Sequence, residues 1–398
     1  MSRRRIFTSM CALVFLVHMG RVIFAALLDP IMQQFAVGPG VAGFVATAVW
    51  LGSALPRVPV GYLLTRIPRQ QVILGAGGML TTAAAFGAFV PTIGLLTVAA
   101  FLIGLSSGAY FIAANPLVSE LYPERVGRAI GIHGSAAQLA GVLAAPFVGV
   151  MLAFGDFRLA FLTMAAAALA VTMALLWIAR DAEFPAAGAE DRDLLGAARA
   201  QWRLILTGVA IIGSAFFVWN GVFNFYVTYL TGTKGLAPAT ARDLLTVIFA
   251  AGVPAFFIGG RLADRFPNVP LLLGLIAAFT LTLVTLTVVT GLIALVIVTV
   301  VMGFVAHSFI PAIDTYLLSA LPDHHRSSAY SVYSGIYMIV QALGSTSVGS
   351  LTAAGIAFDT VFQGGAGGLF LIVVGLTALH RLDRLPRGGR PASKTSDF

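Results

Sequence analysis

Long apolar stretches follow one another along the whole chain, separated by short polar or Gly/Pro-rich breaks. A helix needs about 20 predominantly apolar residues to cross a bilayer, and these stretches have that length. Strands of a membrane β-barrel would instead alternate apolar and polar residues over about ten residues. The pattern therefore predicts an all-α integral membrane protein with twelve spans, at residues 6–28, 41–64, 70–91, 93–121, 128–154, 157–180, 204–230, 240–262, 270–290, 292–320, 327–353 and 358–380.

The composition indicates the same class of protein. Of the 398 residues, 59% are hydrophobic and 10% are charged, and the mean hydropathy is +0.94. A soluble domain cannot stay dispersed with so few charges on its surface. The single cysteine, Cys11, lies in the first expected span, which excludes a disulfide within the chain.

The net charge of +8 is distributed in a way that favours a membrane, and not nucleic acid, as the partner. Lys and Arg gather in the two tails and in alternate loops, whereas the other set of loops holds Arg158, Lys234 and Arg242. Because loops rich in Lys and Arg stay in the cytoplasm, we expect both termini to be cytoplasmic. The apolar stretch after MSRRR has no convincing site for signal-peptide cleavage.

The chain repeats at an offset of 199 residues, half its length. Glycine and proline fix backbone geometry, so a shared register of these residues indicates a shared fold. The matched pairs are Pro39 and Pro238, Thr47 and Thr246, Gly61 and Gly260, Arg66 and Arg265, Pro68 and Pro267, Gly75 and Gly274, Gly104 and Gly303, and Pro123 and Pro322.

The repeat predicts two pseudo-symmetric six-helix halves that run parallel, at residues 1–180 and 204–380. A polar cytoplasmic linker, residues 181–203, joins them, and a basic cytoplasmic tail, residues 381–398, follows. In such a protein the axis between the repeats lies along the membrane normal, and a binding site is expected between them near the midplane. The tail is expected to touch anionic lipid.

One loop carries a family resemblance. The stretch Gly260-Arg-Leu-Ala-Asp-Arg-Phe-Pro-Asn268 resembles the loop signature G-x-L-A-D-R-x-G-R of the major facilitator superfamily, and Gly61-Tyr-Leu-Leu-Thr-Arg-Ile-Pro-Arg69 is the first copy. The resemblance covers nearly the whole chain and implies the major facilitator fold. The first copy departs from the signature, because Thr65 replaces the family's aspartate and Pro68 its later glycine.

The resemblance implies that this loop helps to hold a cytoplasmic gate. A surface charge cluster after the fourth span, which includes Glu120 and Arg128, is expected to contribute to it. The predicted gating residues are Gly61, Arg66, Arg69, Arg128, Gly260, Asp264 and Arg265.

Arg57 stands between Pro56 and Pro59 in an otherwise uncharged span. It precedes Arg66 by nine residues, about 13 Å along a helix, which is too far for its side chain to reach the inner surface. Arg57 could bind an anion, or it could pair structurally with an acid or with backbone carbonyls. The pattern Arg-x-Pro-x-Gly resembles helix two of nitrate/nitrite porters, which implies an anion-binding arginine.

Arg21 lies inside the first span, three residues after His18. The run Arg21-Val-Ile-Phe-Ala-Ala-Leu-Leu-Asp-Pro30 resembles helix one of organic-anion and organophosphate carriers, in some of which an arginine contacts the anion. A tight helix contact is the alternative. The repeat counterpart of Arg21 is Asn220, which shares a helical face with Asn224. This face could line a cavity or form a hydrogen-bonded contact between helices.

His307 and Asp314 are seven residues apart, on one face of the tenth span. Asp314 could take up a transported proton with His307 as a relay. It could instead pair with Arg57 or another cation as a gate, or form a static polar contact. Further predicted cavity residues are Tyr337 of the eleventh span, its repeat counterpart Gln138, and Asn115, the counterpart of Asp314.

These observations predict a secondary active transporter of a prokaryotic plasma membrane, working by alternating access. We expect a small anionic or polar solute, coupled to a proton or another ion gradient. An exporter of drugs or lipophilic cations with the same fold is one alternative, and a membrane receptor or scaffold that binds without transport is another.

The motifs of the chain give no support for a nucleotide, cofactor or metal partner. Gly38-Pro-Gly-Val-Ala-Gly43 matches a dinucleotide-binding pattern, but no strand precedes it. The chain has no Walker lysine, nucleophile–base pair or metal-type cluster, so we expect no enzyme activity, cofactor or metal. The expected partners are a solute, membrane lipid and a coupling proton, with the protein as a monomer.

Overall fold

The computed structural model describes residues 3–64, 66–180, 194–322 and 326–386, and within these ranges all secondary structure is helical. The predicted all-α fold is confirmed. The first elements are α1 (Arg3–Val22), α2 (Phe24–Phe35), α3 (Pro39–Ala54), α4 (Arg57–Leu63), α5 (Arg69–Phe89), α6 (Ile93–Leu121), η1 (Pro123–Arg125), α7 (Val126–Phe154) and α8 (Phe157–Ala179). The others are α9 (Leu194–Ala200), α10 (Trp202–Gly208), the π-helical η2 (Val209–Gly213), α11 (Ser214–Asn224), α12 (Tyr226–Gly232), α13 (Pro238–Arg265), α14 (Asn268–Val288), α15 (Leu292–Ala320), α16 (Arg326–Ala353) and α17 (Phe358–Arg381).

Eleven helical segments among the described residues are long and apolar enough to cross a membrane. α16 corresponds to the remaining predicted span and has 28 residues, but its serine, threonine, tyrosine and glutamine residues make it more polar. The predicted bounds 93–121 and 292–320 coincide with α6 and α15. The predicted linker 181–203 contains α9, and its residues 181–193 lie outside the described ranges.

The second predicted span is interrupted just before Arg57. Proline has no amide hydrogen to donate to the preceding turn, and Pro56 lies between α3 and α4. The Val60 amide donates to the Pro56 carbonyl at 2.8 Å, so helical bonding resumes one turn later. Arg57 is therefore the first residue of a short helix and does not lie in the middle of a long one.

The chain forms two compact units. Unit 1 comprises residues 1–192, 220–246 and 341–358, and unit 2 comprises residues 193–219, 247–340 and 359–398. The halves expected at residues 1–180 and 204–380 stay a prediction.

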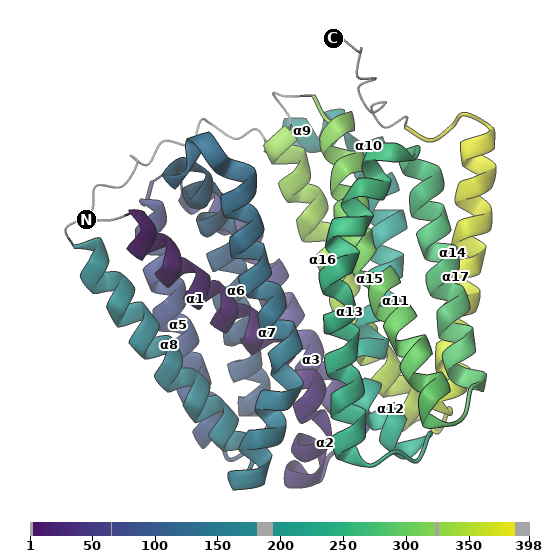
Figure 1. The fold of residues 1–398 in the computed structure, drawn as a ribbon, viewed down its shortest axis with the longest axis horizontal. Coiled ribbons are helices and arrows are strands. Elements are labelled where there is room, and N and C mark those ends of the chain that lie inside the picture. The colour runs from purple at the N-terminus through teal and green to yellow at the C-terminus, as the bar shows by residue number, and fades with distance from the viewer. Residues whose placement is uncertain (1–2, 65, 181–193, 323–325, 387–398) are drawn as a thin grey trace. The chain divides into compact units, whose positions relative to one another are not determined.

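The close approach of α3 and α6 is the main contact within unit 1 and is allowed by glycines. In the same unit, α1 and α5 pack against α6, and α8 packs against α1 and α5 (Figure 1). A Cβ atom on Gly104 would meet the Val49 carbonyl oxygen, and one on Gly52 would meet that of Phe101. Small residues of this kind let membrane helices pack backbone to backbone.

Unit 1 also includes contacts between segments far apart in the sequence. Thr47 of α3 donates to the Ala342 carbonyl at 2.8 Å and accepts from the Thr346 hydroxyl at 2.7 Å. The Thr228 hydroxyl of α12 donates to Asp29 of α2 at 2.6 Å, and these two residues are themselves 199 positions apart. α2 and α3 are thereby fastened to α12 and to the C-terminal part of α16.

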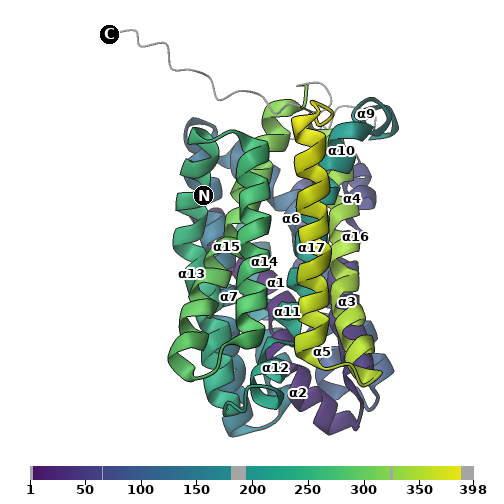
Figure 2. The same ribbon diagram turned by 90° about the vertical axis from the view of Figure 1, so that its right-hand side faces the viewer.

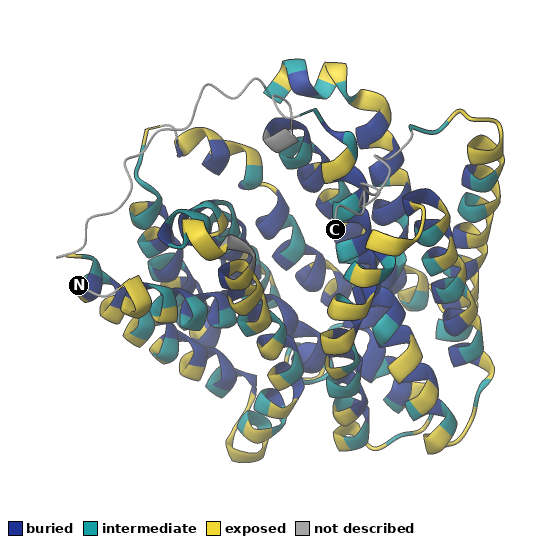
Figure 3. Cartoon of the chain, turned by 45° about the horizontal axis from the view of Figure 1, so that its top comes forward, coloured by how far each residue is buried: buried dark blue, intermediate teal, exposed yellow. Residues whose placement is uncertain are grey.

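In unit 2, α14 packs against α15 and runs beside α17 (Figure 2). The Gln363 amide of α17 donates to the Thr287 hydroxyl of α14 at 3.0 Å. Buried residues occupy the faces where helices meet, and exposed residues lie on the outward faces (Figure 3). Several exposed residues are large and apolar, such as Phe154 at 81% and Ile293 at 78% exposure, as a lipid-facing surface requires.

We expect Gly104→Ala to destabilise the protein by about 1–3 kcal/mol, because the new methyl group would overlap the Val49 carbonyl. Gly78→Ala is the matched control, since a Cβ there meets nothing within 4 Å and alanine favours a helix by about 0.5–1 kcal/mol. Thermal unfolding of the purified proteins in detergent measures both. A Gly104→Ala melting temperature at or above that of the control would contradict the close packing.

Candidate functional site

A buried arginine and its neighbours form the candidate site in unit 1. Arg21 of α1 is 7% exposed. Its Nη1 donates to the Ser53 hydroxyl at 3.2 Å, and its Nη2 lies 2.8 Å from His18 Nδ1. The guanidinium carbon is 4.9 Å from the ring centroid of Trp50 and 5.2 Å from that of Phe111. We call these five residues the Arg21 cluster.

Local helix geometry explains how the cluster forms. His18 and Arg21 are three residues apart on α1, and Trp50 and Ser53 are three apart on α3, so each pair shares one helical face. α6 contributes Phe111 because it approaches α3 closely, and a Cβ on its Gly108 would meet the Ser53 carbonyl. The aromatic rings offer their negative faces to the cation.

A second polar contact in unit 1 was not predicted from the sequence. The Tyr110 hydroxyl donates to the Met10 carbonyl at 2.7 Å and lies 2.9 Å from His133 Nε2. A hydroxyl has a single hydrogen, so His133 donates from Nε2 to the tyrosine oxygen. Tyr110 is fully buried and His133 is 2% exposed. Tyr110 and His133 are 23 positions apart on different helices, a spacing that no helical periodicity reveals.

Three other predicted solute-binding residues of unit 1 lie at different levels of burial. Arg57 is partly buried at the start of α4, Gln138 is partly buried on α7, and Asn115 is exposed on α6. The described hydrogen bonds of Arg21 go to Ser53 and His18. Solute binding by Arg57, Gln138 and Asn115 stays a prediction.

Asn220 and Asn224 form a hydrogen-bonded contact between α11 and α16. The Asn224 amide donates to Ser345 Oγ at 2.9 Å, and the Ser345 hydroxyl donates to Asn220 Oδ1 at 2.6 Å. All three side chains are fully buried. The structure thus shows the helix contact, and solute binding by Asn220 and Asn224 stays a prediction.

Asp314 and Tyr337 lie in unit 2, beside a stack of tyrosines on α16. The Tyr330 hydroxyl donates to Asp314 Oδ1 at 2.8 Å. The ring of Tyr333 lies 5.8 Å from that of Tyr330 and 5.1 Å from that of Tyr337. Arg57 belongs to the other unit, so its pairing with Asp314 stays a prediction.

His307 lies in an aromatic box in unit 2. Its Nδ1 is 2.8 Å from the Gly303 carbonyl oxygen and therefore carries a hydrogen. The rings of Phe249, Trp219 and Phe256 lie 5.3, 5.9 and 6.3 Å from the imidazole. The box could hold either a neutral imidazole or, through cation–π contact, a protonated one.

The predicted gating residues behave unequally in the two copies of the loop. Arg69 forms an ion pair with Glu120 at 2.6 Å, joining the start of α5 to the end of α6. The repeat counterparts of this pair are Asn268 and Ser319, which cannot form an ion pair.

The other gating candidates have varied surroundings. Arg66 is exposed and donates to the Tyr62 hydroxyl at 3.0 Å. Thr65, which replaces the family's aspartate, lies outside the described residues. Gly61 is buried, Gly260 is partly buried, and Arg128, Asp264 and Arg265 are exposed.

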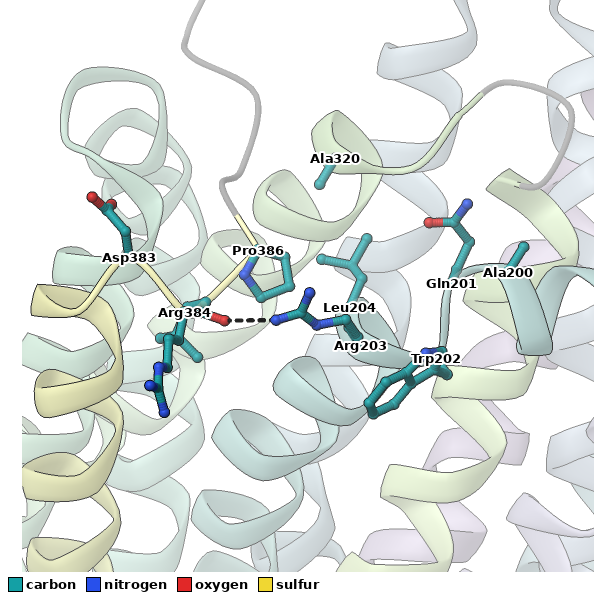
Figure 4. A pocket seen from close by; sticks show the side chains of 10 residues that line it. Ala200, Gln201, Trp202, Arg203, Leu204, Ala320, Asp383, Arg384 and Pro386 are labelled. Atoms are coloured by element: carbon teal, nitrogen blue, oxygen red, sulfur yellow. Dashed lines mark hydrogen bonds between the residues drawn. The ribbon is translucent and has the colours of Figure 1, made fainter.

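A pocket of about 320 Å³ in unit 2 contains none of the predicted site residues (Figure 4). It lies where α10 begins, α15 ends and the chain leaves α17. Arg203 donates to the Arg384 carbonyl at 3.3 Å, and Tyr316 donates to the Pro386 carbonyl at 3.0 Å. These bonds fasten the chain after α17 to the ends of α10 and α15, so we assign the pocket no part in the candidate site.

The helical fold and the apolar outward faces define a multi-pass membrane protein, and comparison with known proteins gives its family. The profile of the Major Facilitator Superfamily matches residues 10–241 and 217–397. The chain belongs to this superfamily.

Curated relatives of the chain are named as transporters. The chain is 25% identical over 287 residues to the probable sulfoacetate transporter SauU of Cupriavidus necator. The matched region covers 66% of this chain and 65% of that protein. It is 29% identical over 140 residues to the niacin transporter NiaP of Acinetobacter baylyi, covering 33% of this chain and 32% of that protein. These matches thus span about a third to two thirds of the relatives' own lengths.

Solved structures share the fold across nearly the whole chain. A bacterial homolog of the human lysosomal transporter Spinster has a TM-score of 0.76 at 17% identity, covering 94% of this chain and 95% of that chain. The nucleoside transporter NupG has a TM-score of 0.80 at 13% identity, covering 94% of this chain and 99% of that chain. At such identities the likeness shows the fold alone.

We expect Tyr110→Phe to destabilise the protein by about 1–3 kcal/mol, because the buried His133 donor and Met10 carbonyl would each lose a partner. Tyr62→Phe is the control, since Tyr62 is 59% exposed and its bond to Arg66 can be replaced by water. Thermal unfolding in detergent compares the two. Equal melting temperatures would show that the Tyr110 contact adds no stability.

Proposed function

We propose that the protein is a secondary active transporter that moves a small anionic solute by alternating access and binds the anion at the Arg21 cluster. The observation that supports this most is the burial of the Arg21 guanidinium in α1, between the rings of Trp50 and Phe111. Membership of the superfamily supports transport as the activity.

The chemistry of the cluster suits a carboxylate or a sulfonate. A guanidinium has five N–H donors in a planar fork that matches two oxygens of such a group. The indole N–H of Trp50 is buried and finds no hydrogen-bond acceptor among the described residues. Buried donors are normally satisfied, so an anion at Arg21 would supply an acceptor that the cluster needs.

The names of two curated relatives fit this solute class. One is named as a probable sulfoacetate transporter and one as a niacin transporter. Sulfoacetate carries a sulfonate and a carboxylate, and niacin carries a carboxylate on an aromatic ring. Both solutes offer the group that Arg21 would bind, and the niacin ring could stack on Trp50 or Phe111.

Transport is coupled to a proton in this proposal, with the protein as a monomer in a prokaryotic plasma membrane and both termini in the cytoplasm. Asp314 is one candidate for the proton, because the Tyr330 hydroxyl holds it in place, and His307 is its candidate relay. Arg69 and Glu120 contribute to the gate.

We expect sulfoacetate or nicotinate to raise the melting temperature of the purified protein, because a ligand of the folded state stabilises it. Arg21→Gln should weaken this binding by about ten- to a hundredfold, the effect of losing a charge-assisted hydrogen bond of roughly 1.5–3 kcal/mol. Arg158→Gln is the matched control, because Arg158 forms an exposed ion pair with Asp156. Thermal unfolding over a range of anion concentrations gives the affinities.

Each other outcome points to an alternative function. Stabilisation by lipophilic cations alone, unchanged in Arg21→Gln, would favour the exporter of drugs or lipophilic cations. Anion binding without uptake into sealed vesicles would favour a receptor. Equal anion affinities in the Arg21→Gln and Arg158→Gln proteins would remove Arg21 from the binding site.

A further inference from the structure

We propose that His18 takes up the proton that accompanies the anion, so that proton and anion bind together at the Arg21 cluster. This inference rests on the proposed function, since it assumes that Arg21 binds the anion. It places the coupling proton in unit 1, next to the solute, and gives His18 a role that its position in the sequence did not reveal.

The hydrogen bond between Arg21 and His18 fixes the state of the imidazole. A guanidinium donates hydrogen bonds and has no acceptor, and it stays protonated in proteins. The 2.8 Å contact of Arg21 Nη2 with His18 Nδ1 therefore requires a lone pair on Nδ1. His18 is neutral in this state, with its hydrogen on Nε2.

Protonation at Nδ1 would change this contact from attraction to repulsion. The hydrogen bond would be lost, and two cations would face each other where one stood before. Arg21 Nη2 would become available to another acceptor. A carboxylate or sulfonate placed against both cations would offset the repulsion, because each side chain could donate to one of its oxygens.

Proton and anion binding at such a site are linked. The anion favours the protonated imidazole, and the protonated imidazole favours the anion, by the same factor in both directions. A monoanion would thereby bring one proton with it. A carrier built this way moves the pair together and is driven by the proton gradient.

Arg21 is the cation in the described hydrogen bond of His18. α1 packs against α5, α6, α7 and α8. The titratable and charged side chains with described partners on these helices pair among themselves: Tyr110 with His133, Arg69 with Glu120, and Arg158 with Asp156. On α2, Asp29 accepts from Thr228.

The test is the pH dependence of anion affinity in the full-length protein, with sulfoacetate and nicotinate as probes. Both keep their acidic groups ionised between about pH 6 and pH 8, so a change in affinity reports a protein group. With one proton per anion we expect wild-type affinity to rise by up to roughly tenfold for each unit that pH falls. An indicator dye in weak buffer should show up to one proton taken up per anion bound.

His18→Asn is the decisive variant. The asparagine oxygen can accept from Arg21 as Nδ1 does, but it does not titrate. We expect its anion affinity to be independent of pH and close to that of the wild type at about pH 8. His133→Gln is the control: it replaces the buried His133 of unit 1, keeps a donor for Tyr110, and should retain the wild-type pH dependence.

Three results would overturn the inference. A His18→Asn protein that keeps the wild-type pH dependence would exclude His18 as the proton acceptor. The proposed function would still stand in that case if anion binding is weakened by Arg21→Gln. A pH profile flattened by Asp314→Asn, and not by His18→Asn, would place the proton in unit 2. Anion binding to the wild type without proton uptake would exclude a coupling proton at this site, and that measurement needs no variant.

Discussion

A permanently charged guanidinium inside a membrane protein sets the strictest requirement in unit 1. Insertion of an arginine at the centre of a membrane helix costs about 2.5–3.5 kcal/mol, so neighbouring groups must replace the water that the cation gives up. Arg21 is 7% exposed, and Ser53, His18 and the rings of Trp50 and Phe111 surround it. The close packing of α3 on α6 is what brings these groups from three helices to one point.

Glycines at matching positions of the two sequence repeats lie at close helix contacts, next to different side chains. Gly104 and its counterpart Gly303 both lie against a carbonyl of a neighbouring helix. One turn further along the first repeat, Gly108 lies against Ser53. In the second repeat the counterpart of Gly108 is His307, and the counterpart of Ser53 is Gly252. A Cβ atom on Gly252 would meet the His307 imidazole. The matching glycines thus lie near the Arg21 cluster in unit 1 and near a histidine among aromatic rings in unit 2.

This difference illustrates that the arrangement of the helices and the chemistry of a binding site depend on different residues. Glycines at helix crossings fix the positions of the backbones, and they match between the repeats. The residues one turn away differ, and they decide which charged group can be held. The solved relatives at 13% and 17% identity share the arrangement of helices, while the chemistry of a site depends on a few side chains at those crossings.

Hydropathy determined the helical class and most of the span bounds, because it depends on residues close together in the chain. Residues 93–121 and 292–320 were predicted as spans and are α6 and α15. The intramembrane position of Arg21 was equally plain from the sequence. Its partners were not, because contacts between helices depend on how each helix is rotated and on residues far apart in the chain. Only the tertiary structure turned Asn220 and Asn224 toward Ser345, joined Tyr110 to His133, and brought Ser53 to Arg21.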